Sequence, residues 1–200
     1  MDEGRLMLIG ILDKPDPMEG PFFEETILIT PSRLSALLQK TLTERTEQIA
    51  INLGLENGPI HAEFRVKAEE INLLEIAPRS IGGYCSRIFR FHPESTLEEL
   101  ILRHSLGRKV DHYRSQGESE GVFMLPVPKE GKLHNVFGIE EARSVKGIKD
   151  VEITLPTGAQ VLPLPDGNQY LGFLFAKGET PEFVESALRE AFSSLSVEIQ

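Results

Sequence analysis

A chain of 200 residues buries enough surface on folding for one sizeable core or two modest ones, so a globular protein is expected. The net charge of −10 argues against a nucleic-acid partner, because affinity for a polyanion comes mainly from Lys and Arg. No stretch is apolar enough to span a membrane, the acidic start is unlike a secretory signal, and the single cysteine allows no internal disulfide, all of which favours a cytoplasmic protein.

The first half of the chain predicts strands and helices in mixed order. The apolar run 6–12 predicts a buried strand, the proline-rich segment 13–21 a loop, and residues 26–30 a second strand. Thr30 and Pro31 suit a helix start, and Gly54 suits its end. The apolar stripe expected on that helix consists of Leu34, Leu37, Leu38, Leu42, Ile49 and Leu53.

A β-hairpin follows, from the strand-like runs 60–66 and 71–77. Residues 85–90 predict a short helical segment, and the capping-box spacing that begins at Ser95 predicts a further helix ending at Gly107. The polar stretch 110–120 lacks either periodicity, so it is the expected domain boundary.

The second half is expected to be rich in short strands. Thr180 and Pro181 open a final helix. The strand-like runs cover residues 121–128, 133–137, 151–155, 161–164 and 170–176. The expected fold class is α+β, with residues 1–110 forming an antiparallel sheet with helices and residues 111–200 forming a small β-rich domain.

The predicted hairpin carries the residues that indicate chemistry. Strand alternation places Glu63 on one face of its strand together with His61 and Arg65, and Glu75 on one face of the next with Ala77 and Arg79. If residues 68–70 form a three-residue loop, Lys67 pairs with Ile71. Counting back along both strands then places Glu63 opposite Glu75.

Two carboxylates on one rung repel each other, so such a pair favours a shared proton or a bound cation. Mg²⁺ is usually held by one or two carboxylates together with substrate phosphates. Arg79 offers a forked contact to phosphate or carboxylate oxygens, and Gly82 and Gly83 let the backbone come close to a ligand. Together these residues are typical of a phosphoryl-transfer site.

A purely structural interpretation of the same residues stays open. Glu63 and Glu75 also suit ordinary outward-facing positions of a sheet, and Arg79 also suits a surface salt bridge. His61 is interpreted as a structural, hydrogen-bonding histidine, because no second His or Cys stands at metal-ligand spacing.

The segments His61-Ala62-Glu63, Glu75-Ile76-Ala77-Pro78-Arg79 and Gly82-Gly83 resemble the ATP-grasp superfamily. Residues 13–17, 22–26 and 172–181 are similar to the branch that contains L-amino acid ligases and carnosine synthase, related to biotin carboxylase. The resemblance covers nearly all of the chain.

The resemblance implies ATP and Mg²⁺ as cofactors, with Mn²⁺ as an alternative ion. It assigns metal binding to Glu63 and Glu75, stabilisation of an acyl phosphate to Arg79, and phosphate contact to Gly82 and Gly83. Ala77 departs from the pattern, because many members carry an Asn ligand there. Glu25 is a candidate for a further metal ligand or for holding the amine substrate, and spacing does not separate it from Glu24.

The resemblance also implies a larger parent protein. Family members carry a lid and a carboxylate-binding domain ahead of this region, so the chain is expected to be a fragment or subunit that works with a missing N-terminal half, in cis or in trans. The parent enzyme would join a small carboxylate and an amino acid amine, and the isolated chain would be inactive. Alternatives are a carboxylase, a purine-pathway ligase or a non-catalytic assembly module; a homo-oligomer stays open.

Overall fold

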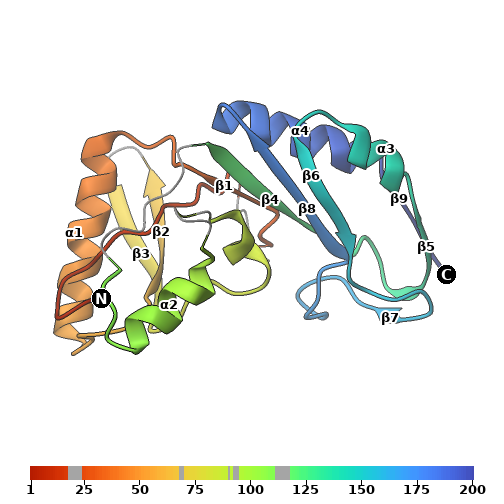
Figure 1. Cartoon of the computed structure of the whole chain (residues 1–200). Coiled ribbons are helices and arrows are strands. Elements are labelled where there is room, and N and C mark those ends of the chain that lie inside the picture. The colour runs from red at the N-terminus through yellow and green to blue at the C-terminus, as the bar shows by residue number, and fades with distance from the viewer. Residues whose placement is uncertain (18–23, 68–69, 90, 92–94, 111–117) are drawn as a thin grey trace. The chain divides into compact units, whose positions relative to one another are not determined.

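The structure is a computed structural model, and it describes residues 1–17, 24–67, 70–89, 91, 95–110 and 118–200 (Figure 1). The described residues fall into two compact units that interrupt each other along the chain. The first unit takes residues from 1–11 and 33–116, and the second takes residues from 12–32 and 117–200. Of the expected boundary at 110–120, residues 111–117 lie outside the described residues.

The first unit holds a helix, a hairpin and two shorter helices. Helix α1 spans Ala36–Asn52, strands β2 (His61–Lys67) and β3 (Glu70–Ala77) form the predicted antiparallel hairpin, and the 3-10 helix η1 (Cys85–Ile88) precedes α2 (Leu97–Ser105). Arg45 of α1 donates to the carbonyl of Ile71 at 3.0 Å, which ties the helix to the hairpin.

Two sequence predictions in this unit are wrong. The run 6–12 forms no strand; the backbone N–H of Leu6 donates instead to the Glu47 carboxylate at 2.8 Å. Helix α1 begins five residues later than Pro31, because Thr30 belongs to a strand and the Ser35 hydroxyl accepts from the N–H of Leu38 at 3.3 Å. Its end at Gly54 is confirmed.

The buried face of α1 also differs from the predicted stripe. Leu42, Thr46 and Ala50 are buried, whereas Leu37 and Leu53 are exposed. The buried positions recur every fourth residue, which is a period of helical type. Counting only large apolar residues therefore found Leu42 and missed Thr46 and Ala50, which share its face.

Helix α2 follows its prediction with a shift of one residue. Its N-cap is Thr96 rather than Ser95, and the Thr96 hydroxyl accepts from the N–H of Glu99 at 3.2 Å. The helix ends before Gly107, as expected, and buries Leu97 and Leu100. Leu106, at the end of the helix, is exposed.

The second unit is built on two antiparallel sheets. One has the order β1-β4-β8-β6, made from Ile27–Thr30, Ser119–Leu125, Gly172–Gly178 and Ile148–Ile153. The other has the order β7-β5-β9, made from Gln160–Val161, Gly131–Phe137 and Ser196–Ile199. Helices α3 (Ile139–Ser144) and α4 (Pro181–Ser193) complete the unit. The expected α+β fold with antiparallel sheets is confirmed; α3 and β9 were not predicted.

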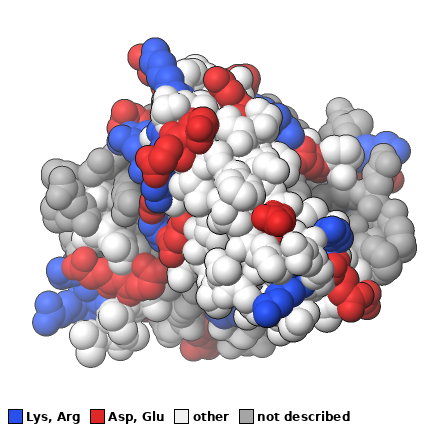
Figure 2. Space-filling view, turned by 90° about the vertical axis from the view of Figure 1, so that its right-hand side faces the viewer, with Lys and Arg blue, Asp and Glu red and all other residues white. Residues whose placement is uncertain are grey.

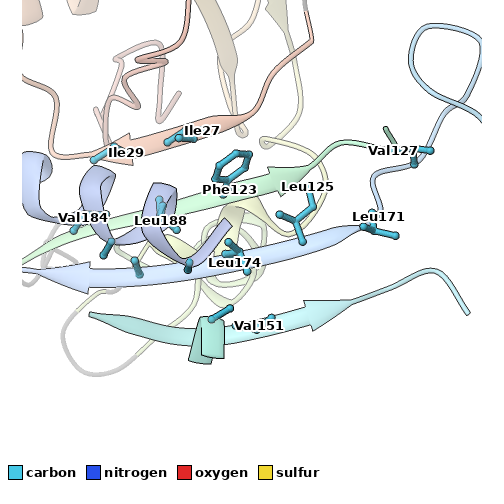
Figure 3. Packing of buried hydrophobic residues seen from close by; sticks show 14 of the residues in the cluster. Ile27, Ile29, Phe123, Leu125, Val127, Val151, Leu171, Leu174, Val184 and Leu188 are labelled. Atoms are coloured by element: carbon cyan, nitrogen blue, oxygen red, sulfur yellow. The ribbon is translucent and has the colours of Figure 1, made fainter. Parts of the chain in front are cut away.

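The main core lies between α4 and the four-stranded sheet (Figure 3). Thr180 caps α4 and Pro181 is its first residue, as predicted, so Val184 and Leu188 point toward the sheet. There they meet alternate residues of the strands, which share one face because side chains alternate along a strand. The labelled strand members are Ile27, Ile29, Phe123, Leu125, Leu174 and Val151.

The surface of the second unit mixes uncharged areas with both signs of charge. Figure 2 faces the side where β5 and β9 lie in Figure 1, and it shows a broad area largely free of charged residues, bordered by acidic and basic ones. None of the helices in the described ranges is long and apolar enough to cross a membrane.

Candidate phosphate and metal site on the β2-β3 hairpin

The register of the hairpin places Glu63 directly opposite Glu75, as predicted. The count that led to this pairing was nevertheless wrong at the loop. Lys67 pairs with Glu70 rather than Ile71, so two residues separate the strands instead of three. A register shift between Phe64 and Glu63 then leaves Leu74 as an extra residue on β3, and this bulge restores the predicted rung.

Four side chains meet on one face of this hairpin. Arg79 Nη2 donates to Glu75 Oε1 at 3.1 Å, and Arg79 Nη1 lies 3.5 Å from His61 Nδ1. On its other side, His61 Nε2 lies 3.6 Å from Glu63 Oε1. In the order Glu63, His61, Arg79 and Glu75, these four side chains form a continuous polar cluster. The two residues at its ends, Glu63 and Glu75, pair across the two strands.

The cluster has a sheltered half and an exposed half. The side chains of His61 and Glu63 are 19% and 21% exposed, whereas those of Arg79 and Glu75 are 52% and 51% exposed. An ion pair as exposed as Arg79–Glu75 contributes only about 0–1 kcal/mol, because water screens it. The Arg79 guanidinium is therefore held only weakly by Glu75.

The donor set fits a divalent ion that also uses phosphate oxygens. Glu63 and Glu75 supply two carboxylates on one rung, which is the number that Mg²⁺ usually takes from protein. Across the part of the chain that the structure describes, no group of three or more His, Cys, Asp or Glu side chains makes a closed cage. The hairpin therefore suits an ion whose remaining ligands come from a nucleotide and water.

Gly82 and Gly83 follow Arg79 in a turn before η1. Gly83 has a φ of +61°, which favours glycine. Beyond the chain neighbours, a Cβ at Gly82 or Gly83 would meet no atom of the described residues within 4 Å. The protein itself thus leaves room beside this backbone, as a ligand-contacting turn requires.

Glu25 lies in the second unit, and the structure distinguishes it from Glu24. Glu25 forms an ion pair with Lys14, whereas burial raises the pKa of Glu24.

A further polar network in the second unit holds the segment that carries Lys14. Asp16 accepts from the Thr26 hydroxyl and from Arg189 Nη2, the latter at 2.6 Å, and Arg189 also contacts Glu185 at 2.8 Å. Burial alone would raise the pKa of Asp16, but the hydrogen bonds from Thr26 and Arg189 and the charge of Arg189 lower it overall. This network was not predicted from the sequence, because Asp16 and Arg189 are far apart in the chain.

His61 is the member of the cluster that sequence analysis assigned to a structural role. The available signal was its position two residues before Glu63, which places both side chains on the same strand face. Its contact with Arg79 was not predicted, although the predicted register already pairs His61 with Ala77, two residues before Arg79.

Two known domain families match this chain. Residues 1–88 match the ATP-grasp domain, and residues 123–200 match the L-amino acid ligase C-terminal domain 2. The first match contains the whole hairpin cluster. The second covers most of the β-rich unit.

Two curated proteins are similar in sequence. An uncharacterized protein, y4rH, of Sinorhizobium fredii is 21% identical over 94% of this chain and 38% of its own length. Alanine-anticapsin ligase of Bacillus amyloliquefaciens is 37% identical over 41% of this chain and 17% of its own length. The chain thus spans well under half the length of these relatives.

Solved structures share the fold over the whole chain. L-amino acid ligase from Bacillus licheniformis has a TM-score of 0.82 at 24% identity, with 100% of this chain and 50% of that chain covered. Phosphoribosylglycinamide synthetase from Anaerococcus prevotii has a TM-score of 0.76 at 11% identity, with 100% and 51% covered. A biotin carboxylase domain from Hydrogenobacter thermophilus has a TM-score of 0.69 at 13% identity, with 99% and 44% covered.

These matches confirm the ATP-grasp resemblance and leave the specific reaction open among amino acid ligation, purine-pathway ligation and carboxylation. The chain is thus similar to ATP-grasp domains over residues 1–88 and to L-amino acid ligase C-terminal domains over residues 123–200.

Proposed function

We propose that this chain supplies the metal- and phosphate-binding wall of an ATP-dependent carboxylate-amine ligase. The observation that carries the proposal is the hairpin of an ATP-grasp domain in which Glu63 and Glu75 share a rung and Arg79 lies on their face. Residues up to about 110 act as the ATP-grasp part, and the β-rich remainder is the ligase C-terminal domain.

The roles follow from the chemistry of each side chain. Glu63 and Glu75 hold Mg²⁺, or Mn²⁺ in its place, which when bound neutralises charge on the phosphates of ATP. Arg79 offers two N–H groups to the acyl phosphate of the carboxylate substrate. The backbone at Gly82 and Gly83 approaches the phosphates, and Glu25 orients the amine or binds a further ion after release from Lys14.

Amino acid ligation is favoured over the other reactions of the fold by the C-terminal family match and by alanine-anticapsin ligase. A carboxylase or purine-pathway ligase is the second candidate, because enzymes with these names share the fold. An assay of ADP release by the parent enzyme separates them: pairs of amino acids stimulate release in the first case, and bicarbonate or a phosphoribosyl amine does so in the second.

The chain spans about half the length of the solved ligases, which supports a partner half that completes the nucleotide site. The isolated 200-residue chain is therefore expected to bind ATP weakly, through metal and phosphate contacts in an open and wet site, and to turn over no substrate. Calorimetric titration with Mg-ATP and an ADP-release assay test this. Sustained ADP release by the purified chain alone, with contaminating ATPase excluded, would contradict it.

A further inference from the structure

We infer that His61 is a positioning residue for Arg79, holding its guanidinium on the hairpin face through an uncharged contact that survives when a cation occupies Glu75. The inference rests on the proposed function in one respect, namely that Arg79 is positioned for contact with phosphate. The contact itself, between His61 Nδ1 and Arg79 Nη1 at 3.5 Å, belongs to the metal-free chain.

The chemistry of the two groups fixes which proton lies where. A guanidinium only donates hydrogen bonds, so His61 Nδ1 must be the bare, accepting nitrogen in this contact. The ring proton then resides on Nε2, which lies 3.6 Å from Glu63 Oε1. In this tautomer the accepting Nδ1 faces the Arg79 donor, and the protonated Nε2 faces the Glu63 carboxylate.

The other contacts of Arg79 explain why His61 matters. Nη2 reaches Glu75 at 3.1 Å, and Nη1 reaches the carbonyl of the adjacent Ser80 at 3.0 Å. A divalent ion bound to Glu75 would compete with the Arg79–Glu75 contact. The Ser80 carbonyl belongs to the residue next to Arg79, so that contact does not tie Arg79 to the opposite strand. Among the described residues, His61 is then the remaining side chain of the opposite strand that contacts Arg79.

The environment of His61 suits this task. It is sheltered, at 19% exposure, while the Arg79 side chain is 52% exposed and gains little from an ion pair in water. The half-exposed Arg79 side chain loses conformational entropy when it is held in one conformation. Because His61 already holds it before phosphate binds, less conformational entropy is lost in the binding step.

The test uses three variants that separate the two ring nitrogens. In His61→Asn the amide can place an oxygen near the position of Nδ1, in His61→Gln the amide reaches toward that of Nε2, and in His61→Ala both are lost. All three are measured in the metal-free chain at one mildly alkaline pH, with melting temperature and hairpin amide shifts as controls of folding.

The first readout is rotation of the Arg79 guanidinium about its Nε–Cζ bond, measured by ¹⁵N exchange NMR and assigned with Arg79→Lys. His61→Ala and His61→Gln are expected to speed rotation roughly two- to tenfold, as the loss of one hydrogen bond predicts, and His61→Asn is expected to restore slow rotation. Unchanged rotation in His61→Ala, or equal rescue by Gln and Asn, overturns the inference.

The second readout is Mn²⁺ affinity with and without inorganic tripolyphosphate. The increase in Mn²⁺ affinity that tripolyphosphate causes is expected to be roughly two- to tenfold smaller in His61→Ala and His61→Gln than in the wild type, and unchanged in His61→Asn. A wild-type chain that binds neither probe would count against the proposed function, while the rotation measurement still decides the role of His61.

Discussion

Arg189 Nη2 lies 2.6 Å from Asp16 Oδ1, although the two residues are 173 positions apart in sequence. Because Thr26 donates to the other oxygen of the same carboxylate, Asp16 joins α4 to the segment just before β1 within the second unit. The same segment carries Lys14, the partner of Glu25. This network therefore links the C-terminal helix to a candidate substrate residue.

Asp16→Asn should destabilise the second unit by about 1 kcal/mol at neutral pH, since it weakens charge-assisted hydrogen bonds in a partly exposed pair. The folded-state pKa of Asp16 is lowered, so its stabilisation is present above the ordinary carboxyl pKa and is lost as the pH falls through the lowered value. The melting temperatures of the wild type and of Asp16→Asn should therefore converge as the pH is lowered.

The matched control is Glu140→Gln, because Glu140 pairs with Arg143 in the same unit but its side chain is 81% exposed. That variant should melt within experimental error of the wild type at every pH. A difference between Asp16→Asn and the wild type that stays constant into strong acid would show that the carboxylate charge is not the cause.

Glu63→Gln and Glu75→Gln should each weaken Mn²⁺ binding by about tenfold or more, because each removes one of two charged ligands on the shared rung. The fold should survive, since an amide retains the side-chain volume. Glu44→Gln is the control: Glu44 belongs to an exposed pair with Lys40 on α1 in the same unit. Equal Mn²⁺ affinity in all three variants would remove the hairpin from consideration as a metal site.

Arg79→Lys in the parent enzyme should lower turnover about a hundredfold or more, equivalent to roughly 3 kcal/mol, because an ammonium does not reproduce the planar two-pronged contact. Its melting temperature should hardly change, since the pair with Glu75 is half exposed. Turnover and melting are measured on one sample. Normal turnover contradicts a catalytic role, and lost turnover with a collapsed melting temperature indicates a structural one.

Leu174→Ala should destabilise the second unit by about 2–5 kcal/mol, because Leu174 is fully buried between the sheet and α4 (Figure 3). Leu162→Ala in the same unit should cost well under half as much, since Leu162 is 42% exposed. Chemical denaturation measures both. Similar costs at the two sites would mean that this sheet face is not the core of the unit.

The hairpin shows how far the sequence alone reaches. Strand alternation identified the face that holds Glu63 and Glu75, and the rung they share was predicted correctly. The loop length and the bulge at Leu74 were both missed, and the two errors cancelled. Neither feature has a strong signal here, because the loop carries no Asn-Gly or Asp-Gly pair and Leu74 is an ordinary strand residue.

Other parts of the fold depend on contacts that sequence periodicity does not contain. Capping chemistry correctly located α4 at Thr180, where the hydroxyl and the following proline agree. The same two residue types at Thr30 and Pro31 predicted a helix that begins only after Ser35, because Thr30 is used in pairing with Glu120 instead. That pairing joins distant parts of the chain and was not predicted.

The origin of β1 has a practical consequence for dividing this protein into pieces. Ile27–Thr30 pairs with β4 along its whole length, so the edge strand of the C-terminal sheet comes from a segment that precedes the β2-β3 hairpin. A piece cut to residues 118–200 would lack that strand and would bare the apolar, unpaired margin of β4 around Val122 and Phe123. Such a margin recruits strands from neighbouring molecules, so the excised domain would tend to self-associate at high concentration.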